Sequence, residues 1–293
     1  MKHDHKLAKI SLGLTSIFFI CFQFAYAQEA SRFIRFVPGA SDWHGELQTS
    51  IVSFSNSVGT KLDLVSAVHL GDKGYYEQLN EEFRNKDIVL YELVAETGQR
   101  PLLNSKKTGS SPMSFLQKAM GNFLRLSFQL EQIDYSPRNF THADLTPSQL
   151  KMAMEVKDQN LFSTFITLAA AHSPNGGSAD VSKGLDNSLD FMSVLNALTS
   201  GNHINSLKYL FGEELGKADG FRMTEEFENE IPILGERNRA VINKLVEVIS
   251  DSANQRIAIF YGAAHMPGIE RSITEELGFQ LESQRWLSAW RIP

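Results

Sequence analysis

Two segments about 200 residues apart each end in a histidine that follows an apolar run. The run at residues 62–68 is followed by His69, and the run at residues 256–261 leads through small residues to His265. Neutral imidazole is the commonest protein ligand for divalent transition metals. Each histidine alone also fits a hydrogen-bonded structural role. Two histidines in equivalent settings predict that His69 and His265 share one metal ion or one substrate.

Glu92 is a carboxylate inside the apolar segment 87–94. Burying a carboxylate without a partner costs free energy, so a metal ion, an arginine or a catalytic role is needed to explain it. We predict that Glu92 binds a metal ion or takes part in catalysis. The alternative is a salt bridge with Arg237.

Arg237 and Asn238 are further candidates for catalysis. The arginine has five donors in a rigid fork, which suits a substrate carboxylate or a developing oxyanion. Its alternative role is that of an ion-pair partner for Glu92, Asp72 or Glu236. Asn238 either binds substrate or caps the helix that we expect it to begin.

Three more polar residues fall near the expected site. Asp72 follows His69 closely, and three roles are open to it. It could be a further metal ligand, it could orient His69 by a hydrogen bond, or it could be a turn residue. His142 and Asp144 lie in a stretch without clear periodicity. They could reach the site, but we expect Asp144 to serve a turn.

The elements around His69 and Glu92 predict that these two residues lie close together. Residues 62–68 and 87–94 are typical of buried strands, and residues 75–86 have the apolar spacing of a helix. Such a β-α-β unit places its strands parallel. The residues that follow the carboxyl ends of parallel strands face the same crevice, so His69 and Glu92 are expected at one edge of the sheet.

His265 joins this edge if residues 256–261 form another parallel strand of the same sheet. We expect a helix at 267–277 directly after it, and the N-terminus of a helix favours an anion such as an oxyanion. The prediction is therefore that His69, Glu92 and His265 converge on one site.

The rest of the chain completes the prediction of an α/β fold with a mainly parallel central sheet flanked by helices. Strands are also expected at 32–37, 47–54 and 279–292, and a helix at 238–250. Between the two histidine segments, about residues 114–215 are predicted to form a large helical insertion that lies over the site. Four helices are expected in this insertion, at 114–130, 146–171, 188–198 and 203–215. The second is expected to begin with a capping box formed by Thr146 and Gln149.

The first 27 residues are typical of a signal peptide. Three lysines precede the apolar stretch 10–24, and Ala25-Tyr26-Ala27 is a cleavage signal. The apolar stretch is shorter than the roughly 20 residues that a membrane span needs. We therefore predict an exported protein, periplasmic or extracellular, whose residues 28–293 form one domain without a stable membrane anchor.

Composition and missing motifs exclude several classes of protein. The formal charge is −6, of which the first 27 residues contribute +2, so the mature chain is near −8 and is a poor candidate for binding nucleic acid. The single cysteine, Cys21, lies in the segment to be removed, which excludes disulfides and thiolate catalysis in the mature chain. The sequence has no His-Glu-x-x-His motif, no Gly-x-Ser-x-Gly motif and no phosphate-binding glycine loop.

Taken in order, these motifs resemble those of the TraB/GumN family, which includes the TIKI proteases and is distantly similar to ChaN-like and erythromycin-esterase-like proteins. Ser66-Ala-Val-His69 and Gly262-Ala-Ala-His265 match its paired Gly-x-x-His motifs, with Ser66 where the family has glycine. Glu92 matches a glutamate on the strand after the first motif, and Arg237-Asn238 matches an Arg-Asn pair before the second. The match covers about residues 62–94 and 235–278.

The resemblance implies a metal-dependent hydrolase, and most directly a TIKI-like metallopeptidase that acts on a peptide or small-molecule substrate. His69 and His265 would hold a divalent ion (Mn, Co or Zn) that activates a water, with Glu92 as the third ligand or the general base, and Arg237 would stabilise the oxyanion. The alternative is a periplasmic haem- or metal-binding protein of ChaN-like type, with the same histidines as ligands and no catalysis. The sequence indicates neither the metal, the substrate nor the oligomeric state.

Overall fold

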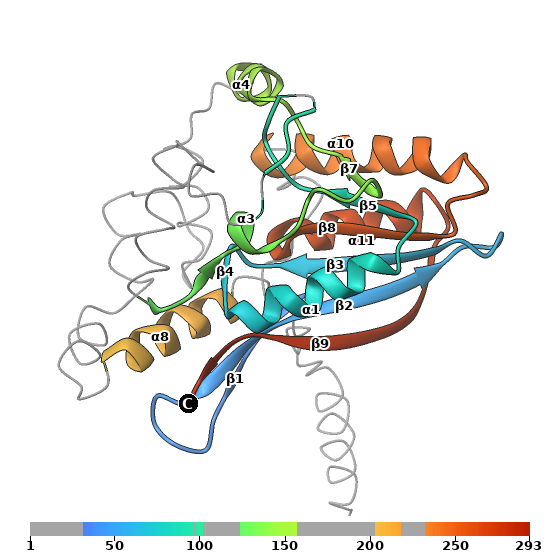
Figure 1. The fold of residues 1–293 in the computed structure, drawn as a ribbon. Helices are drawn as coiled ribbons and strands as arrows, with labels where there is room; N and C mark the ends of the chain where they lie inside the picture. The colour runs from blue at the N-terminus through green and yellow to red at the C-terminus, as the bar shows by residue number, and fades with distance from the viewer. Residues whose placement is uncertain (1–31, 97, 102, 104–123, 157–202, 218–231) are drawn as a thin grey trace, which may run out of the picture. The chain divides into compact units, whose positions relative to one another are not determined.

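A mixed sheet of seven strands is the centre of the described part of the chain (Figure 1). The computed structural model describes residues 32–96, 98–101, 103, 124–156, 203–217 and 232–293, which belong to one compact unit, Ser31–Pro293. The strands of this sheet are β1 Ile34–Pro38, β2 Gly45–Ser55, β3 Lys61–Ala67, β5 Ile88–Tyr91, β7 Phe140–His142, β8 Arg256–Gly262 and β9 Gln280–Ile292.

Four of these strands are parallel neighbours, in the order β3, β8, β5, β7. The sheet continues beyond β3 with antiparallel pairs. Strand β2 pairs with β9 along its whole length, with β1 along its first half and with β3 along its second half. The predicted α/β fold, with a mainly parallel central sheet flanked by helices, is confirmed. Since β8 lies between β3 and β5, the two strands of the predicted β-α-β unit are two strand spacings apart.

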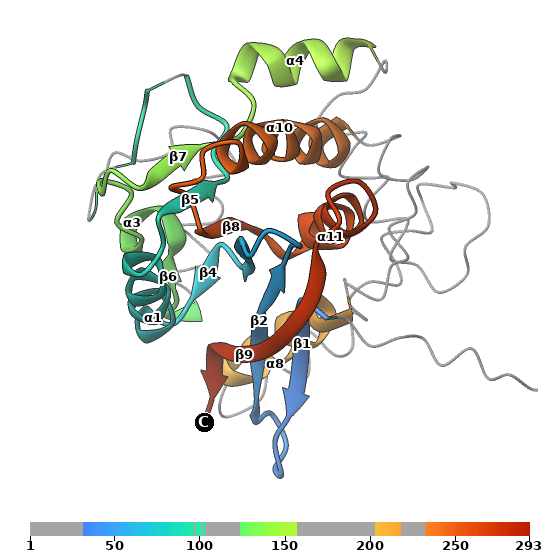
Figure 2. The same ribbon diagram turned by 90° about the vertical axis from the view of Figure 1, so that its right-hand side faces the viewer.

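Helices cover both faces of the parallel strands (Figure 2). Helix α1 Lys73–Arg84 packs on one face, together with the short helix α3 Gln129–Gln132, whereas α10 Pro232–Ile249 and α11 Met266–Glu275 pack on the other. Alternate residues of β8 contact opposite layers, because Ile257 and Ile259 belong to the cluster under α10 and α11, and Ala258 and Phe260 to the cluster under α1. This double burial explains why the strand is apolar from Ile257 to Phe260.

A third apolar cluster forms where α8 His203–Lys217 packs against β1, β2 and β9. Leu207 and Leu210 of α8 contribute to this cluster together with Leu47 and Trp290 of the sheet. Helix α4 Pro147–Val156 packs on α10 and begins with the predicted capping box: Thr146 N–H donates to Gln149 Oε1, and Gln149 N–H donates to Thr146 Oγ1.

The segment 114–215 contains strands as well as helices in its described part. Strand β6 Ser127–Phe128 pairs with β4 Leu70–Gly71, and α3 follows it directly, so the prediction of a continuous helix over 114–130 is wrong for its last residues. Strand β7 lies in the stretch 134–144, which we expected to be irregular, and it joins the main sheet. Residues 114–123 and 157–202 of the predicted insertion, and the predicted signal peptide, lie outside the described residues.

Helix α10 begins six residues earlier than predicted. Its first residue is Pro232. Proline suits this position, because its missing N–H would have no partner within the helix and its fixed φ matches the helical value. Asn238 is therefore inside the helix, and the interpretation of Asn238 as a helix cap is wrong. Among the described residues, none of the helices combines the length and the apolar character that crossing a membrane requires.

Candidate functional site

Polar residues follow the carboxyl ends of all four parallel strands. The register pairs Ala67 of β3 with Gly262 of β8, and Tyr91 of β5 with Phe260 of β8 and with His142 of β7. Because parallel strands end at the same edge of a sheet, the residues that follow them lie along one edge. These residues are His69 after β3, His265 after β8, Glu92 after β5 and Asp144 after β7. The parallel arrangement that we predicted for β3, β5 and β8 is confirmed.

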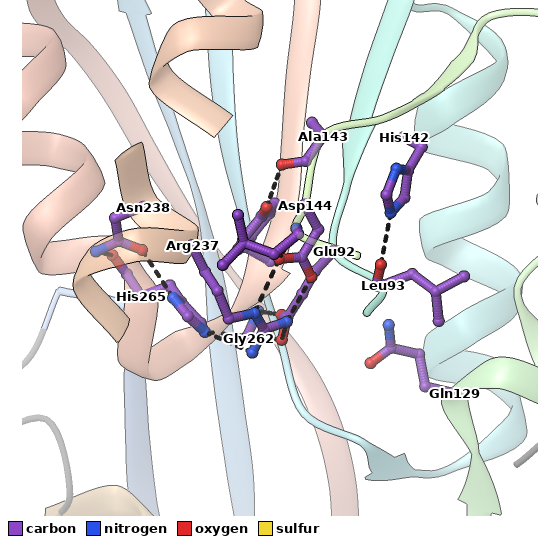
Figure 3. A network of polar contacts seen from close by, with 12 residues as sticks. Glu92, Leu93, Gln129, His142, Ala143, Asp144, Arg237, Asn238, Gly262 and His265 are labelled. Atoms are coloured by element: carbon purple, nitrogen blue, oxygen red, sulfur yellow. Dashed lines mark hydrogen bonds and ion pairs between the residues drawn. The ribbon is translucent and has the colours of Figure 1, made fainter. Parts of the chain in front are cut away.

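Arg237 of α10 is the centre of a buried ionic cluster at this edge (Figure 3). Its Nη2 donates to Glu92 Oε1 at 2.7 Å and to Asp144 Oδ2 at 2.6 Å, and its Nε donates to Asp144 Oδ1 at 2.9 Å. The Asp144 side chain is 0% exposed and also accepts the N–H of Leu145. The salt bridge between Glu92 and Arg237 is thus present, and our assignment of Asp144 to a turn alone is wrong.

Gly262 gives the Glu92 carboxylate room to approach the backbone of β8. The second carboxylate oxygen, Oε2, accepts the Gly262 N–H at 2.6 Å. A Cβ at position 262 would lie 3.3 Å from this oxygen, which is tighter than ordinary van der Waals contact. The glycine that opens the second histidine motif therefore has a direct physical role in placing Glu92.

His265 lies in the short 3-10 helix η2 Ala263–His265 between β8 and α11 and is 4% exposed. Its Nδ1 is 2.7 Å from Asn238 Oδ1. Because an amide oxygen only accepts, this bond places the proton on Nδ1 and leaves a lone pair on Nε2. That atom lies 3.7 Å from Glu92 Oε1 and 3.4 Å from Arg237 Nη1. Asn238 thus orients the imidazole toward the ionic cluster.

Burial and the neighbouring charges set the protonation of this cluster. Burial lowers the pKa of His265 to about 4, against the opposing effect of the Glu92 charge, so the imidazole is neutral at pH 7. Burial alone would raise the pKa of Glu92, but electrostatic interactions, chiefly with Arg237 and also with His265 and His69, together with the Gly262 N–H, more than offset it, and the pKa is lowered. The charges of Glu92 and Asp144 likewise outweigh burial and raise the pKa of Arg237.

His69 is exposed beyond the end of β3, and its backbone oxygen accepts the N–H of Gln129 at 2.9 Å. It is near enough for its electrostatic interaction to lower the pKa values of Glu92 and His265. Within the described residues, no group of three or more His, Cys, Asp and Glu side chains is arranged to hold a metal ion. The three-ligand site of His69, Glu92 and His265 therefore stays a prediction.

Asp72 and His142 have partners outside the ionic cluster. Asp72 Oδ2 accepts the N–H of Arg291 on β9 at 2.9 Å, and its Oδ1 lies 3.8 Å from Lys208 Nζ on α8. The carboxylate thus links α1 to β9 and α8, and these contacts do not give it the predicted role of orienting His69. His142 donates from Nε2 to the Leu93 carbonyl at 2.6 Å, which Figure 3 shows to one side of the cluster.

Two features of the site were not predicted from the sequence. The amide of Asn238 bonds to an imidazole, which follows only once the helix is known to begin at Pro232. The role of Asp144 follows from β7, whose three residues are too few to give an alternating or apolar pattern. One signal was present: Asp144 directly follows Ala143, which is buried, just as Glu92 directly follows the buried end of its strand.

Comparison with known proteins does not assign the chain to a family. No family model, curated protein or solved structure matches the chain. The likeness to the TraB/GumN family therefore stays a prediction that rests on the motifs alone.

Proposed function

We propose that this protein is an exported, metal-dependent hydrolase that cleaves a peptide bond at the cluster of Glu92, Arg237 and His265. The observation that carries the proposal is a neutral, buried imidazole whose Nε2 accepts from Arg237 Nη1 at 3.4 Å and lies 3.7 Å from Glu92 Oε1. A neutral imidazole nitrogen and an ionised carboxylate oxygen at that separation can both bind one divalent ion. Export rests on the features of the first 27 residues.

Two of the described donor side chains, Glu92 and His265, are of the kinds that a divalent cation binds. Glu92 and Asp144 supply two carboxylates against the one guanidinium of Arg237, and His265 is neutral, so the described cluster carries a net charge of −1. Two atoms 3.7 Å apart are within reach of one ion, because such ions bind nitrogen and oxygen ligands at about 2.0–2.2 Å. Glu92 and His265 would hold the ion, with His69 as the third ligand at the same edge.

Each residue has a distinct task in the proposed reaction. A bound divalent ion would supply Lewis acidity, lowering the pKa of a water and polarising the substrate carbonyl. Asn238 keeps the proton on Nδ1 of His265 so that Nε2 faces the reactants. Glu92 would hold the ion through Oε1, while its Oε2 accepts the Gly262 N–H. The guanidinium of Arg237 would stabilise negative charge that develops on the carbonyl oxygen.

The test is hydrolysis of a mixed peptide library by the purified protein, read by mass spectrometry. We expect cleavage that stops with a chelator and returns with Mn²⁺, Co²⁺ or Zn²⁺. Glu92→Gln and His265→Gln should each lower the cleavage rate by a factor on the order of 100 or more. His142→Gln is the matched control, because His142 bonds to a backbone carbonyl outside the cluster, and it should leave the rate unchanged.

Two results would contradict the proposal. Cleavage that survives both the chelator and His265→Gln would assign the activity to another site or to a contaminant. Stoichiometric metal or haem binding without any turnover would favour the carrier function instead.

A further inference from the structure

Arg237 is bonded unequally to its two carboxylates. Two donors, Nε and Nη2, engage both oxygens of Asp144 at 2.9 and 2.6 Å, which is a bidentate pair. Glu92 receives one bond, from the Nη2 that Asp144 shares, and the contact of Nη1 with His265 Nε2 is long at 3.4 Å. The guanidinium is therefore held chiefly by Asp144.

The atoms of Glu92 and His265 that Arg237 contacts are the same two that a divalent cation would use. Glu92 Oε1 and His265 Nε2 both lie beside the guanidinium, so Arg237 is itself the cation that occupies the neighbourhood of these ligands. Binding of a metal ion requires Arg237 to give up its bond to Glu92 Oε1. The guanidinium and the ion compete for one carboxylate oxygen.

Asp144 decides how costly that exchange is. Arg237 is only 8% exposed, and a buried charge that loses its partner is strongly destabilised. With Asp144 present, an Arg237 released from Glu92 keeps two charge-assisted hydrogen bonds. Without the Asp144 charge, Glu92 would be the remaining carboxylate of the described cluster, and the guanidinium would retain it against an incoming ion.

We propose that Asp144 is a positioning residue that holds Arg237 so that Glu92 and His265 can exchange the guanidinium for a divalent cation. This inference rests on the proposed function, because it concerns the metal affinity of the same site. During turnover Arg237 would then stay bonded to Asp144 beside the metal ion, where it can face a developing oxyanion.

The test is calorimetric titration of Co²⁺ into the purified, chelator-treated protein. Asp144→Asn should raise the Kd for Co²⁺ by roughly 10- to 100-fold, the range found for residues that support metal ligands. Adding Arg237→Gln to Asp144→Asn should restore the affinity to within about threefold of the wild type, because the competing cation is gone. Asp134→Asn is the matched control, since Asp134 precedes β7 and accepts the Ser136 N–H, and it should leave the Kd unchanged.

The outcomes separate this inference from the proposed function. Equal Co²⁺ affinity of the wild type and Asp144→Asn would overturn the inference and leave the metal site in place. A loss in Asp144→Asn that Arg237→Gln does not restore would also overturn it, because Asp144 would then act on the ligands or the fold rather than through Arg237. A wild-type protein that binds no Co²⁺ would overturn both.

A second measurement covers the case in which Asp144→Asn does not fold. In wild-type protein labelled with ¹⁵N, the Arg237 Nε–H resonance should stay in slow exchange with solvent when Zn²⁺ is added, because the bond to Asp144 persists. The Nη2 resonance should shift as its bond to Glu92 is released. An Nε–H that is lost on addition of Zn²⁺, or an Nη2 that does not shift, would overturn the inference.

Discussion

At the scale of single residues, the site depends on how three neighbours fix the state of His265. Asn238 selects the tautomer, burial keeps the ring neutral, and Glu92 Oε1 lies 3.7 Å from Nε2. The sequence pointed to His265 and Glu92 because both interrupt apolar strands. It did not point to the Asn238 bond, because the pairing joins two helical segments 27 residues apart and depends on where α10 begins.

The lowered pKa of His265 predicts a specific pH dependence of stability in the metal-free protein. An unfolded histidine takes up a proton below about pH 6.5, whereas the folded one resists until about pH 4. The unfolded state therefore binds more protons in this range, and stability, full above pH 6.5, falls as the pH falls. The loss from this residue should reach about 2 kcal/mol between about pH 7 and pH 5.

Chemical denaturation of chelator-treated protein at several pH values measures this loss. His265→Gln should remove it, so the difference in unfolding free energy between wild type and variant should shrink as the pH falls. Measurements above about pH 5 avoid the titration of Glu92. Its lowered pKa contributes stability that is fully present above the pKa of an unfolded glutamate and is lost only as the pH falls below that value. Parallel curves for the two proteins would contradict the assigned state of His265.

At the scale of elements, the site is the edge where four parallel strands end. Strands β3, β5 and β8 were predictable because burial on both faces makes them mostly apolar, and their order along the chain implied a parallel sheet. Strand β7 was not predictable, because three residues carry no periodicity and its place depends on pairing with Tyr91 and its neighbours. With β7 missed, Asp144 was missed as a partner of Arg237.

The packing of α8 on β1 gives a prediction at this scale. A Cβ at Gly216 of α8 would lie 2.5 Å from the backbone nitrogen of Phe36, so Gly216→Ala should force the helix off β1 and destabilise the fold by about 1–3 kcal/mol. Gly74→Ala is the matched control in α1, where nothing lies within 4 Å, and the better helix former should stabilise the protein by up to about 1 kcal/mol. Opposite shifts in the midpoint of thermal unfolding are expected, and a Gly216→Ala protein as stable as the wild type would contradict the packing.

At the scale of the whole molecule, the fold class was predictable and the contents of the middle segment were not. The alternation of strands and helices up to residue 94 and after residue 235 indicated an α/β fold, and its parallel core is as expected. Within 114–215 the helical pattern obscured β6 and β7, since two- and three-residue strands are specified by their tertiary partners rather than by local sequence.

Export is the prediction that concerns the chain as a whole. The basic start, the apolar stretch and Ala25-Tyr26-Ala27 should direct cleavage after Ala27. Sequencing the N-terminus of protein isolated from the cell envelope should give Gln28 as the first residue. Replacing Ala27 with a bulky residue should block cleavage and leave the longer chain. A mature protein that retains Met1 would contradict the prediction.

The central claim, a divalent metal held by His265 and Glu92, is tested most directly by the metal content of protein purified without chelators. Inductively coupled plasma mass spectrometry should find about one equivalent of one transition metal in the wild type and in His142→Gln. It should find almost none in a folded His265→Gln variant. A wild-type protein without stoichiometric metal, or a His265→Gln variant with the wild-type content, would contradict the claim.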